Sequence, residues 1–164
     1  LLDNVTLGLE IMGVDPAERK DRAERWLSRL GLDGFLGAFP GELSGGMRQR
    51  AALARAFAVN PEILLADEAF GHLDEVTARQ IRGQFFDMVR DEKKTAILVT
   101  HQLEEAIETG DRLLVFGRPA TLLADVRLDA WKPEELAGLR ARIQDTLQTN
   151  EPDPELARTQ ERGR

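Results

Sequence analysis

The chain has 164 residues and a mass of 18.3 kDa, which is enough to bury one sizeable hydrophobic core. Hydrophobic residues make up 42% of it and charged residues 31%, which excludes general disorder. The longest apolar runs, such as 63–66, are only four residues long, which excludes a membrane-spanning helix. The net charge of −7 argues against nucleic acid as a partner, because nucleic-acid binding depends on neutralising phosphates.

The absence of cysteine and of a leader segment bears on the cellular compartment of the protein. It has no cysteine, so disulfides and thiolate zinc sites are excluded, and its two histidines are too few for a histidine-rich metal site. It begins at Leu1 instead of methionine and shows no leader segment. We therefore expect a fragment of a cytosolic protein.

The first sixty residues are predicted to be helical. Apolar periodicity predicts a helix over about 5–12, and Asp15 followed by proline predicts the capped start of a second helix that ends at Gly31. The segment 32–42 is rich in glycine and proline and is expected to form a loop. A third helix, rich in small residues, is expected over about 44–59. The large apolar side chains of the loop are expected to turn inward: Phe35, Leu36 and Phe39.

A parallel sheet is predicted next. The run 63–66 is short and wholly apolar, which is typical of a strand buried on both faces, and 95–100 repeats this pattern. Between them, Asp74 is expected to cap a long amphipathic helix.

The remaining elements are predicted to be a short helix, a hairpin and a final helix. The short acidic helix ends at Gly110, and two strands over 113–126 flank Gly117 and Pro119. The last helix spans about 133–150 and is followed by a polar, mobile tail. This order of helices and strands predicts an α/β fold.

Ser44-Gly45-Gly46 stands where a loop becomes a helix. Glycines let a ligand approach the backbone, and free amides at a helix start attract phosphate. A simple capped turn is the plainer interpretation, since such tripeptides are common.

Charged side chains follow both predicted strands. Asp67 and Glu68 end the first, where one carboxylate could bind Mg²⁺ and the next could polarise water. His101 follows the second strand, within reach of a γ-phosphate at the carboxyl end of a parallel sheet. The alternatives are two solvated acids, a loop histidine and, for Asp74, a helix cap.

Three motifs follow one another in the chain: Leu-Ser-Gly-Gly-Met-Arg-Gln-Arg at 43–50, Leu-Leu-Ala-Asp-Glu-Ala-Phe-Gly-His-Leu-Asp at 64–74, and Val-Thr-His-Gln at 99–102. In this order they resemble the signature, the Walker B motif with D-loop, and the switch histidine of ABC transporter ATP-binding subunits. The similarity extends from Leu1 to about Val126. The segments 70–74 and 104–107 are most similar to the nitrate/sulfonate/taurine importer group.

The resemblance implies a P-loop NTPase-like (ABC ATPase) core, incomplete, with part of the helical signature subdomain and a C-terminal helix. It implies a helical subdomain over 1–60, a RecA-like α/β core over 61–127, and a C-terminal helix and mobile tail over 128–164. The implied ligands are ATP and Mg²⁺. The implied site residues are Ser44, Gly45, Gly46, Gln49 and Asp74 for the nucleotide, Asp67 for the metal, Glu68 as general base and His101 as γ-phosphate sensor.

The family also implies partners. Its ATPases work as head-to-tail dimers, so the signature residues 44–46 would contact ATP held by a second ATP-binding subunit. Transmembrane permease subunits would hold the protein on the inner face of the cell membrane, and a solute-binding protein would be an indirect partner. The expected activity is ATP hydrolysis that powers uptake of a nitrate-, sulfonate- or taurine-like solute.

The chain departs from the family at several positions. No G-x-x-x-x-G-K-[ST] sequence occurs, because no lysine follows a glycine. The chain as given is therefore not expected to be active alone. Ala66 and Ala69 stand where the family often has a larger apolar residue and a proline, which concerns the rate and not the identity of the reaction.

Three other interpretations are possible. A non-catalytic remnant could bind a partner subunit or contribute its signature in trans. An ATPase head of DNA repair or chromosome maintenance would carry coiled-coil heptads or a cysteine zinc hook, which this chain lacks. An unrelated α/β domain would have to match all three motifs, in order, by accident.

Overall fold

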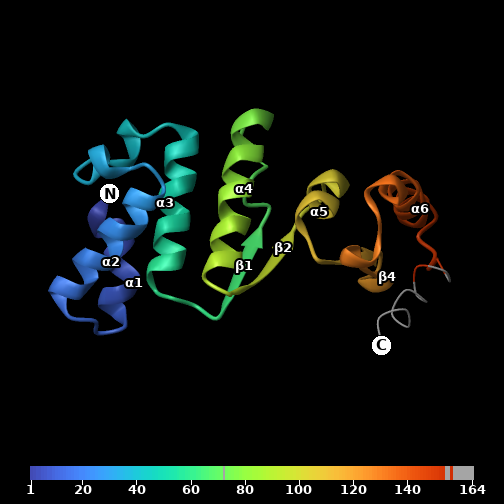
Figure 1. Ribbon diagram of the computed structural model, residues 1–164, viewed down its shortest axis with the longest axis horizontal. Coiled ribbons are helices and arrows are strands. Elements are labelled where there is room, and N and C mark those ends of the chain that lie inside the picture. The colour runs from blue at the N-terminus through green and yellow to red at the C-terminus, as the bar shows by residue number, and fades with distance from the viewer. Residues whose placement is uncertain (72, 154–155, 157–164) are drawn as a thin grey trace. The chain divides into compact units, whose positions relative to one another are not determined.

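The computed structural model describes residues 1–71, 73–153 and 156 (Figure 1). The chain divides into two compact units, 1–99 and 100–164. Each unit has a hydrophobic cluster of its own, so the expectation of one core from chain length is wrong. The boundaries predicted after residues 60 and 127 divide the chain by function and not by compactness. They therefore stay predictions.

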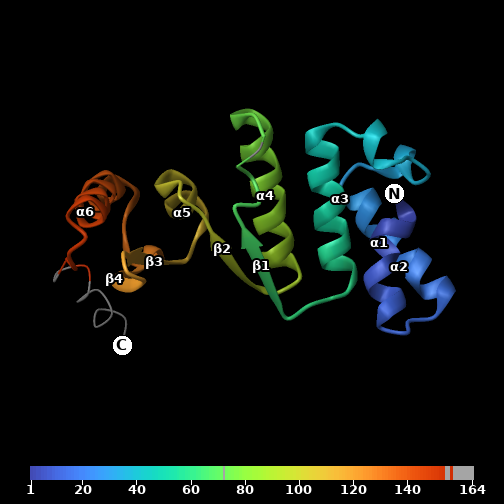
Figure 2. The same ribbon diagram turned by 180° about the vertical axis from the view of Figure 1, so that it is seen from behind.

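The first unit begins with a layer of helices: α1 (Leu2–Ile11), α2 (Pro16–Arg29) and α3 (Gly45–Ala58). The predicted start of α2 is confirmed, since the Asp15 carboxylate accepts a hydrogen bond of 2.9 Å from Ala17 N. Helix α1 begins three residues before its predicted start near residue 5. Gly31 follows the end of α2 with a φ of +69°, a conformation that favours glycine. Figures 1 and 2 both show α3 between this helix pair and α4 (Glu75–Asp91).

The parallel sheet is confirmed. Strands β1 (Ile63–Asp67) and β2 (Thr95–Val99) pair in parallel, from Ile63 opposite Thr95 to Asp67 opposite Val99. Helix α4 connects them and lies beside β1 in both views (Figures 1 and 2). Its apolar positions are buried as predicted: Ala78, Ile81, Phe85, Met88 and Val89.

The prediction that β1 is buried on both faces is wrong. Leu64 is buried in the first cluster and Ala66 packs against it, whereas Leu65 on the opposite face is 78% exposed. Ile97 of β2 is also more than half exposed. An apolar run reports how hydrophobic a strand is, but the elements that cover it decide whether both of its faces are buried.

The loop 32–42 contains two short turns, η1 (Asp33–Phe35) and η2 (Pro40–Glu42). The inward orientation predicted for its aromatic side chains is wrong, since Phe35 and Phe39 are exposed, Phe39 to 74%. Backbone hydrogen bonds hold this loop, such as Leu2 N to Leu36 O at 2.9 Å. Of the three side chains predicted to turn inward, only Leu36 packs against the core.

The second unit contains the predicted short helix, hairpin and final helix: α5 (Leu103–Thr109), β3 (Arg112–Gly117), β4 (Thr121–Arg127) and α6 (Leu136–Thr149). The strands are antiparallel, and short turns η3 (Leu128–Ala130) and η4 (Pro133–Glu135) lead into α6. The buried side chains of α6, including Leu139 and Ile143, join the second cluster with Val115 and Val126.

The segment after α6 differs from the mobile tail predicted for it. The Arg142 guanidinium donates to the Asp153 carboxylate at 2.8 Å and 3.0 Å, and Leu156 is fully buried in the second cluster. The rest of that prediction falls on 154–155 and 157–164, which lie outside the described residues.

Across 1–71, 73–153 and 156, the structure has no helix whose length and apolar character would suit a membrane crossing.

Candidate functional site

A polar pocket lies where the N-terminus of α3 faces the N-terminus of α4. It is lined by Ser44, Gly45, Gly46, Arg50, Leu73, Asp74, Thr77 and Gln80. The pocket therefore brings together four of the residues predicted for the nucleotide, those at 44–46 and Asp74, although about thirty positions separate them in the sequence.

Both helix starts at the pocket are capped by the predicted residues. Ser44 Oγ accepts a hydrogen bond of 3.2 Å from Met47 N, and Asp74 Oδ1 accepts one of 3.0 Å from Thr77 N. The capping interpretation of both residues is thus confirmed. Two helix N-termini direct their partial positive charge to the same place, which favours an anion such as a phosphate.

The glycines permit the close approach of the two helices. A Cβ added to Gly46 would lie 3.0 Å from Thr77 Cγ2, and one added to Gly45 would lie 3.4 Å from Leu73 Cδ2. Any larger residue at position 46 would have to displace Thr77, whose amide donates the hydrogen bond by which Asp74 caps α4. Gly46 and the Asp74 cap are therefore linked through a single threonine.

The Asp74 carboxyl group stays ionised under ordinary conditions. Hydrogen bonds from Thr77, first from its side chain and then from its backbone, lower the pKa of Asp74. An ionised carboxylate repels phosphate oxygens at contact distance. The role that suits Asp74 is therefore to fix the start of α4. Its carboxylate could also accept hydrogen bonds from donor groups on the ligand or on the chain that carries it.

Asp67 and Glu68 lie at the carboxyl end of β1, exposed and outside the lining of the pocket. Glu68 N donates to Val99 O at 2.9 Å, so the turn after β1 is fixed to the end of β2. Glu68 has a φ of +46°, which is uncommon and strained for a residue with a side chain. Strained residues of this kind cluster at functional sites.

No group of three acidic or histidine side chains able to hold a metal is found in the described part of the chain. Mg²⁺ is commonly held by one or two carboxylates, water and substrate phosphates. The exposed Asp67 carboxylate fits that kind of site and does not fit a cage built from protein alone.

His101 belongs to the second unit and is exposed. It follows Val99 by two residues, through a turn in which Thr100 Oγ1 accepts a hydrogen bond of 3.0 Å from Gln102 N. Its approach to a γ-phosphate stays a prediction. Gln49, also predicted to bind nucleotide, is half-buried and does not line the pocket, whereas its neighbour Arg50 does.

Sequence reasoning missed three polar pocket residues: Arg50, Thr77 and Gln80. Helical spacing could have found them, since residues three or four apart share a face of a helix. Arg50 is four positions after Gly46 on α3, while Thr77 and Gln80 are three and six positions after Asp74 on α4.

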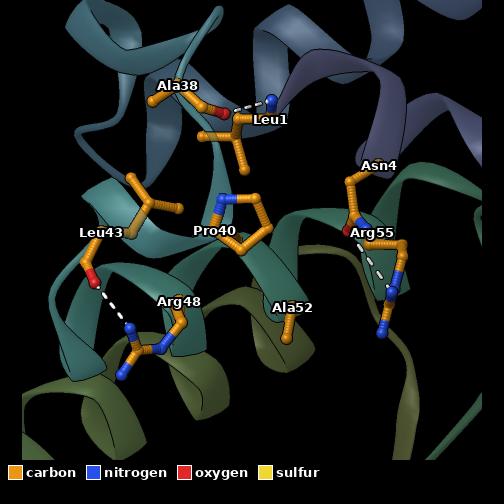
Figure 3. Close-up of a pocket in the computed structure, with 9 residues that line it drawn as sticks. Leu1, Asn4, Ala38, Pro40, Leu43, Arg48, Ala52 and Arg55 are labelled. Atoms are coloured by element: carbon orange, nitrogen blue, oxygen red, sulfur yellow. Dashed lines mark hydrogen bonds between the residues drawn. The ribbon is translucent and has the colours of Figure 1, made fainter.

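A second hollow lies between α1, α3 and the loop 32–42 (Figure 3). Its walls are mainly apolar and small, and two arginines stand at its sides: the lining residues are Leu1, Asn4, Ala38, Pro40, Leu43, Arg48, Ala51, Ala52 and Arg55. Arg48 Nη1 donates to Leu43 O at 2.7 Å, and Arg55 Nη1 donates to Asn4 Oδ1 at 3.3 Å (Figure 3).

The fold is that of a nucleotide-binding cassette. The chain superimposes on the crystal structure of the ADP conformation of an ATP-binding cassette of an ABC transporter with a TM-score of 0.67 and 21% identity. The match covers 97% of this chain and 61% of that one.

The sequence comparisons agree. A family model described as ABC transporter matches residues 1–71. The taurine import ATP-binding protein TauB of Rhizobium johnstonii is 47% identical over 130 residues, which are 79% of this chain and 50% of TauB. The glycine betaine/carnitine transport ATP-binding protein GbuA of Listeria monocytogenes is 43% identical over 129 residues, 74% of this chain and 32% of GbuA. By sequence and by fold the chain is similar to the ATP-binding domains of ABC transporters, and it spans half or less of the length of these two relatives.

Proposed function

We propose that the chain is part of the ATP-hydrolysing subunit of an ABC-type importer. The observation that carries this proposal is the pocket that joins the signature residues 44–46 to Asp74. Two capped helix starts and two glycines produce a site for a phosphate that arrives from outside the unit. In the family such a site meets the γ-phosphate of ATP held by a second ATP-binding subunit, so the pocket forms half of a head-to-tail dimer site.

The carboxyl end of β1 supplies the chemistry. Asp67 would hold Mg²⁺, mostly through water, and a bound Mg²⁺ would offset phosphate charge and orient the phosphates. Glu68 accepts a proton from the attacking water, and the turn that fixes its backbone to Val99 orients its carboxylate. His101 stabilises charge at the γ-phosphate and does not take the proton.

The solute is proposed to be a nitrate-, sulfonate- or taurine-like compound. The 47% identity with the taurine import protein supports this class, and the similarity to the glycine betaine/carnitine transport protein extends the range to those two solutes. The solute itself would be selected by a solute-binding protein and permease subunits.

The hollow of Figure 3 is the proposed docking place for the permease subunits. Its apolar floor and flanking Arg48 and Arg55 suit a short helix that presents small apolar side chains with an acidic residue. This contact would hold the protein at the cytoplasmic face of the membrane. The division into a helical subdomain over 1–60, a catalytic core over 61–127 and a C-terminal helix is proposed with it.

The test is made on the full-length ATP-binding subunit, assembled with its permease subunits in proteoliposomes. Glu68→Gln keeps the shape of the side chain but removes the general base, so ATP turnover should fall by at least about 100-fold. ATP binding should stay within about twofold of the wild type, because the pocket residues are unchanged. Glu75→Gln, an exposed acid in the first turn of α4, is the matched control and should leave turnover unchanged.

Wild-type turnover in Glu68→Gln would contradict the assigned role. A full-length assembly that binds ATP without hydrolysing it would support the alternative, a non-catalytic subunit that contributes its signature in trans.

A further inference from the structure

The loop between β1 and α4 joins the proposed general base to the pocket. It runs from Glu68 to Asp74, and both end residues are exposed carboxylates. Phe70 between them is only 3% exposed, so its ring is buried in the first cluster. The position of both carboxylates therefore depends on a loop that is anchored to the core by a phenyl ring.

Phe70 contacts a series of aromatic rings. Its centroid lies 5.9 Å from that of Phe85 on α4, and Phe85 lies 6.0 Å from Phe57 on α3 in an edge-to-face arrangement. Phe57 in turn lies 5.0 Å from Trp26 on α2. The Phe70–Phe85 and Trp26–Phe57 pairs are tilted, at interplanar angles of 58° and 36°. Aromatic pairs at these centroid distances are favourable beyond the area that they bury.

Two backbone hydrogen bonds mark the ends of the loop. Gly71 N donates to Glu68 O at 3.2 Å, and Thr77 N donates to Asp74 Oδ1 at 3.0 Å. Glu68 holds its left-handed conformation only because the surrounding structure fixes it. Among the residues that the structure describes between these two hydrogen bonds, Phe70 has the one deeply buried side chain, because Ala69 and Leu73 are only partly buried.

We infer that Phe70 is a positioning residue for ATP hydrolysis. Its ring is buried and outside the lining of the pocket, and its contact with Phe85 sets the geometry of Glu68 on one side and Asp74 on the other. Movement of α2 or α3 would reach the loop through the same rings. This inference rests on the proposed function.

The test compares Phe70→Leu with Phe86→Leu in the full-length subunit with its permease subunits. Phe86 is the matched control, because its ring also contacts Phe85, at 5.0 Å, but lies on α4 outside the loop. A small displacement of a catalytic group reduces the rate steeply. We expect kcat of Phe70→Leu to fall at least about tenfold with KM for ATP within about twofold, while Phe86→Leu stays within about twofold in both.

A second measurement does not depend on activity. Amide hydrogen exchange at Gly71 and Thr77 should be at least about tenfold faster in Phe70→Leu than in the wild type, and within about twofold of it in Phe86→Leu. Equal effects of the two variants on kcat or on exchange would overturn the inference, as would faster exchange in Phe70→Leu without loss of kcat. If the wild-type complex does not hydrolyse ATP, the proposed function fails, and so does a role of Phe70 in hydrolysis. The exchange rates would then show whether the ring orders the loop.

Discussion

Thr77 shows how one side chain serves both structure and site. Its amide and hydroxyl bond to Asp74, and its methyl group lies against Gly46 of the neighbouring helix. The ionisation of Asp74, the cap of α4 and the contact between α3 and α4 therefore all depend on Thr77. A change at Thr77 should appear first in the titration of Asp74.

Thr77→Val keeps the side-chain shape and the backbone hydrogen bond but removes the hydroxyl group. Because the Thr77 side chain is the main cause of the lowered pKa of Asp74, we expect this pKa to rise toward its ordinary value. A carboxyl whose pKa is lowered by folding stabilises the protein above its unfolded-state pKa, and this contribution disappears as pH falls through the folded-state pKa. Thr77→Val should therefore be less stable than the wild type near pH 7 and approach it in acid.

Carbon-detected NMR titration of the Asp74 carboxyl would measure the shift, with Thr77→Ser as the control that keeps a hydroxyl group. An unchanged pKa in Thr77→Val would show that the backbone hydrogen bond alone lowers it.

At the scale of elements, the approach of α3 to α4 decides whether the pocket exists. In Gly46→Ala the new methyl group would lie 3.0 Å from Thr77 Cγ2 and 3.6 Å from Ile81 Cδ1, so the Thr77 side chain would have to give by a few tenths of an ångström. We expect a loss of about 1–2 kcal/mol in the free energy of unfolding, as for other overpacked sites. Gly83→Ala, on α4 with open space around it, should instead gain about 0.5–1 kcal/mol through helix propensity.

Urea unfolding of both variants makes this comparison directly. If Gly46→Ala were as stable as Gly83→Ala, the two helix starts would tolerate a wider separation than the structure shows.

Elements that depend on local chemistry could be predicted from the sequence. Asp15, Ser44 and Asp74 each begin a helix because a side-chain oxygen can bond to an amide two or three residues ahead. Exposure could not be predicted in the same way. Leu65 and Phe39 are exposed because no described element covers them, and this depends on tertiary neighbours that a local pattern does not contain.

Most residues of the candidate site could be identified from the sequence, but their arrangement in space could be predicted only in part. The motif resemblance placed Ser44 and Asp74 at the same nucleotide, and the pocket brings them together. Arg50 and Gln80 were missed because their types are common on helix surfaces and only the packing of α3 against α4 turns them to the pocket.

At the scale of the whole molecule, the two hydrophobic clusters suggest two folding units. Neither cluster includes buried residues of the other, and each contains one tryptophan at its margin: Trp26 in the first and Trp131 in the second. The protein therefore carries a fluorescent reporter for each unit. Tryptophan emission changes when burial is lost, so single-tryptophan variants can follow each unit alone.

Ile143→Ala should destabilise the second unit selectively. Ile143 on α6 is fully buried, and removing its outer carbons from a packed core costs about 2–5 kcal/mol. In a Trp26→Phe background, where only Trp131 reports, we expect a clear fall in the urea midpoint. In a Trp131→Phe background the Trp26 midpoint should stay unchanged, because Ile143 belongs to the second cluster and Trp26 packs against the first. Leu27→Ala on α2 should give the mirror result, since Leu27 is fully buried in the first cluster. If both reporters shifted together in both variants, the chain would unfold as one cooperative body, and the two clusters would be coupled through more than the backbone that joins them.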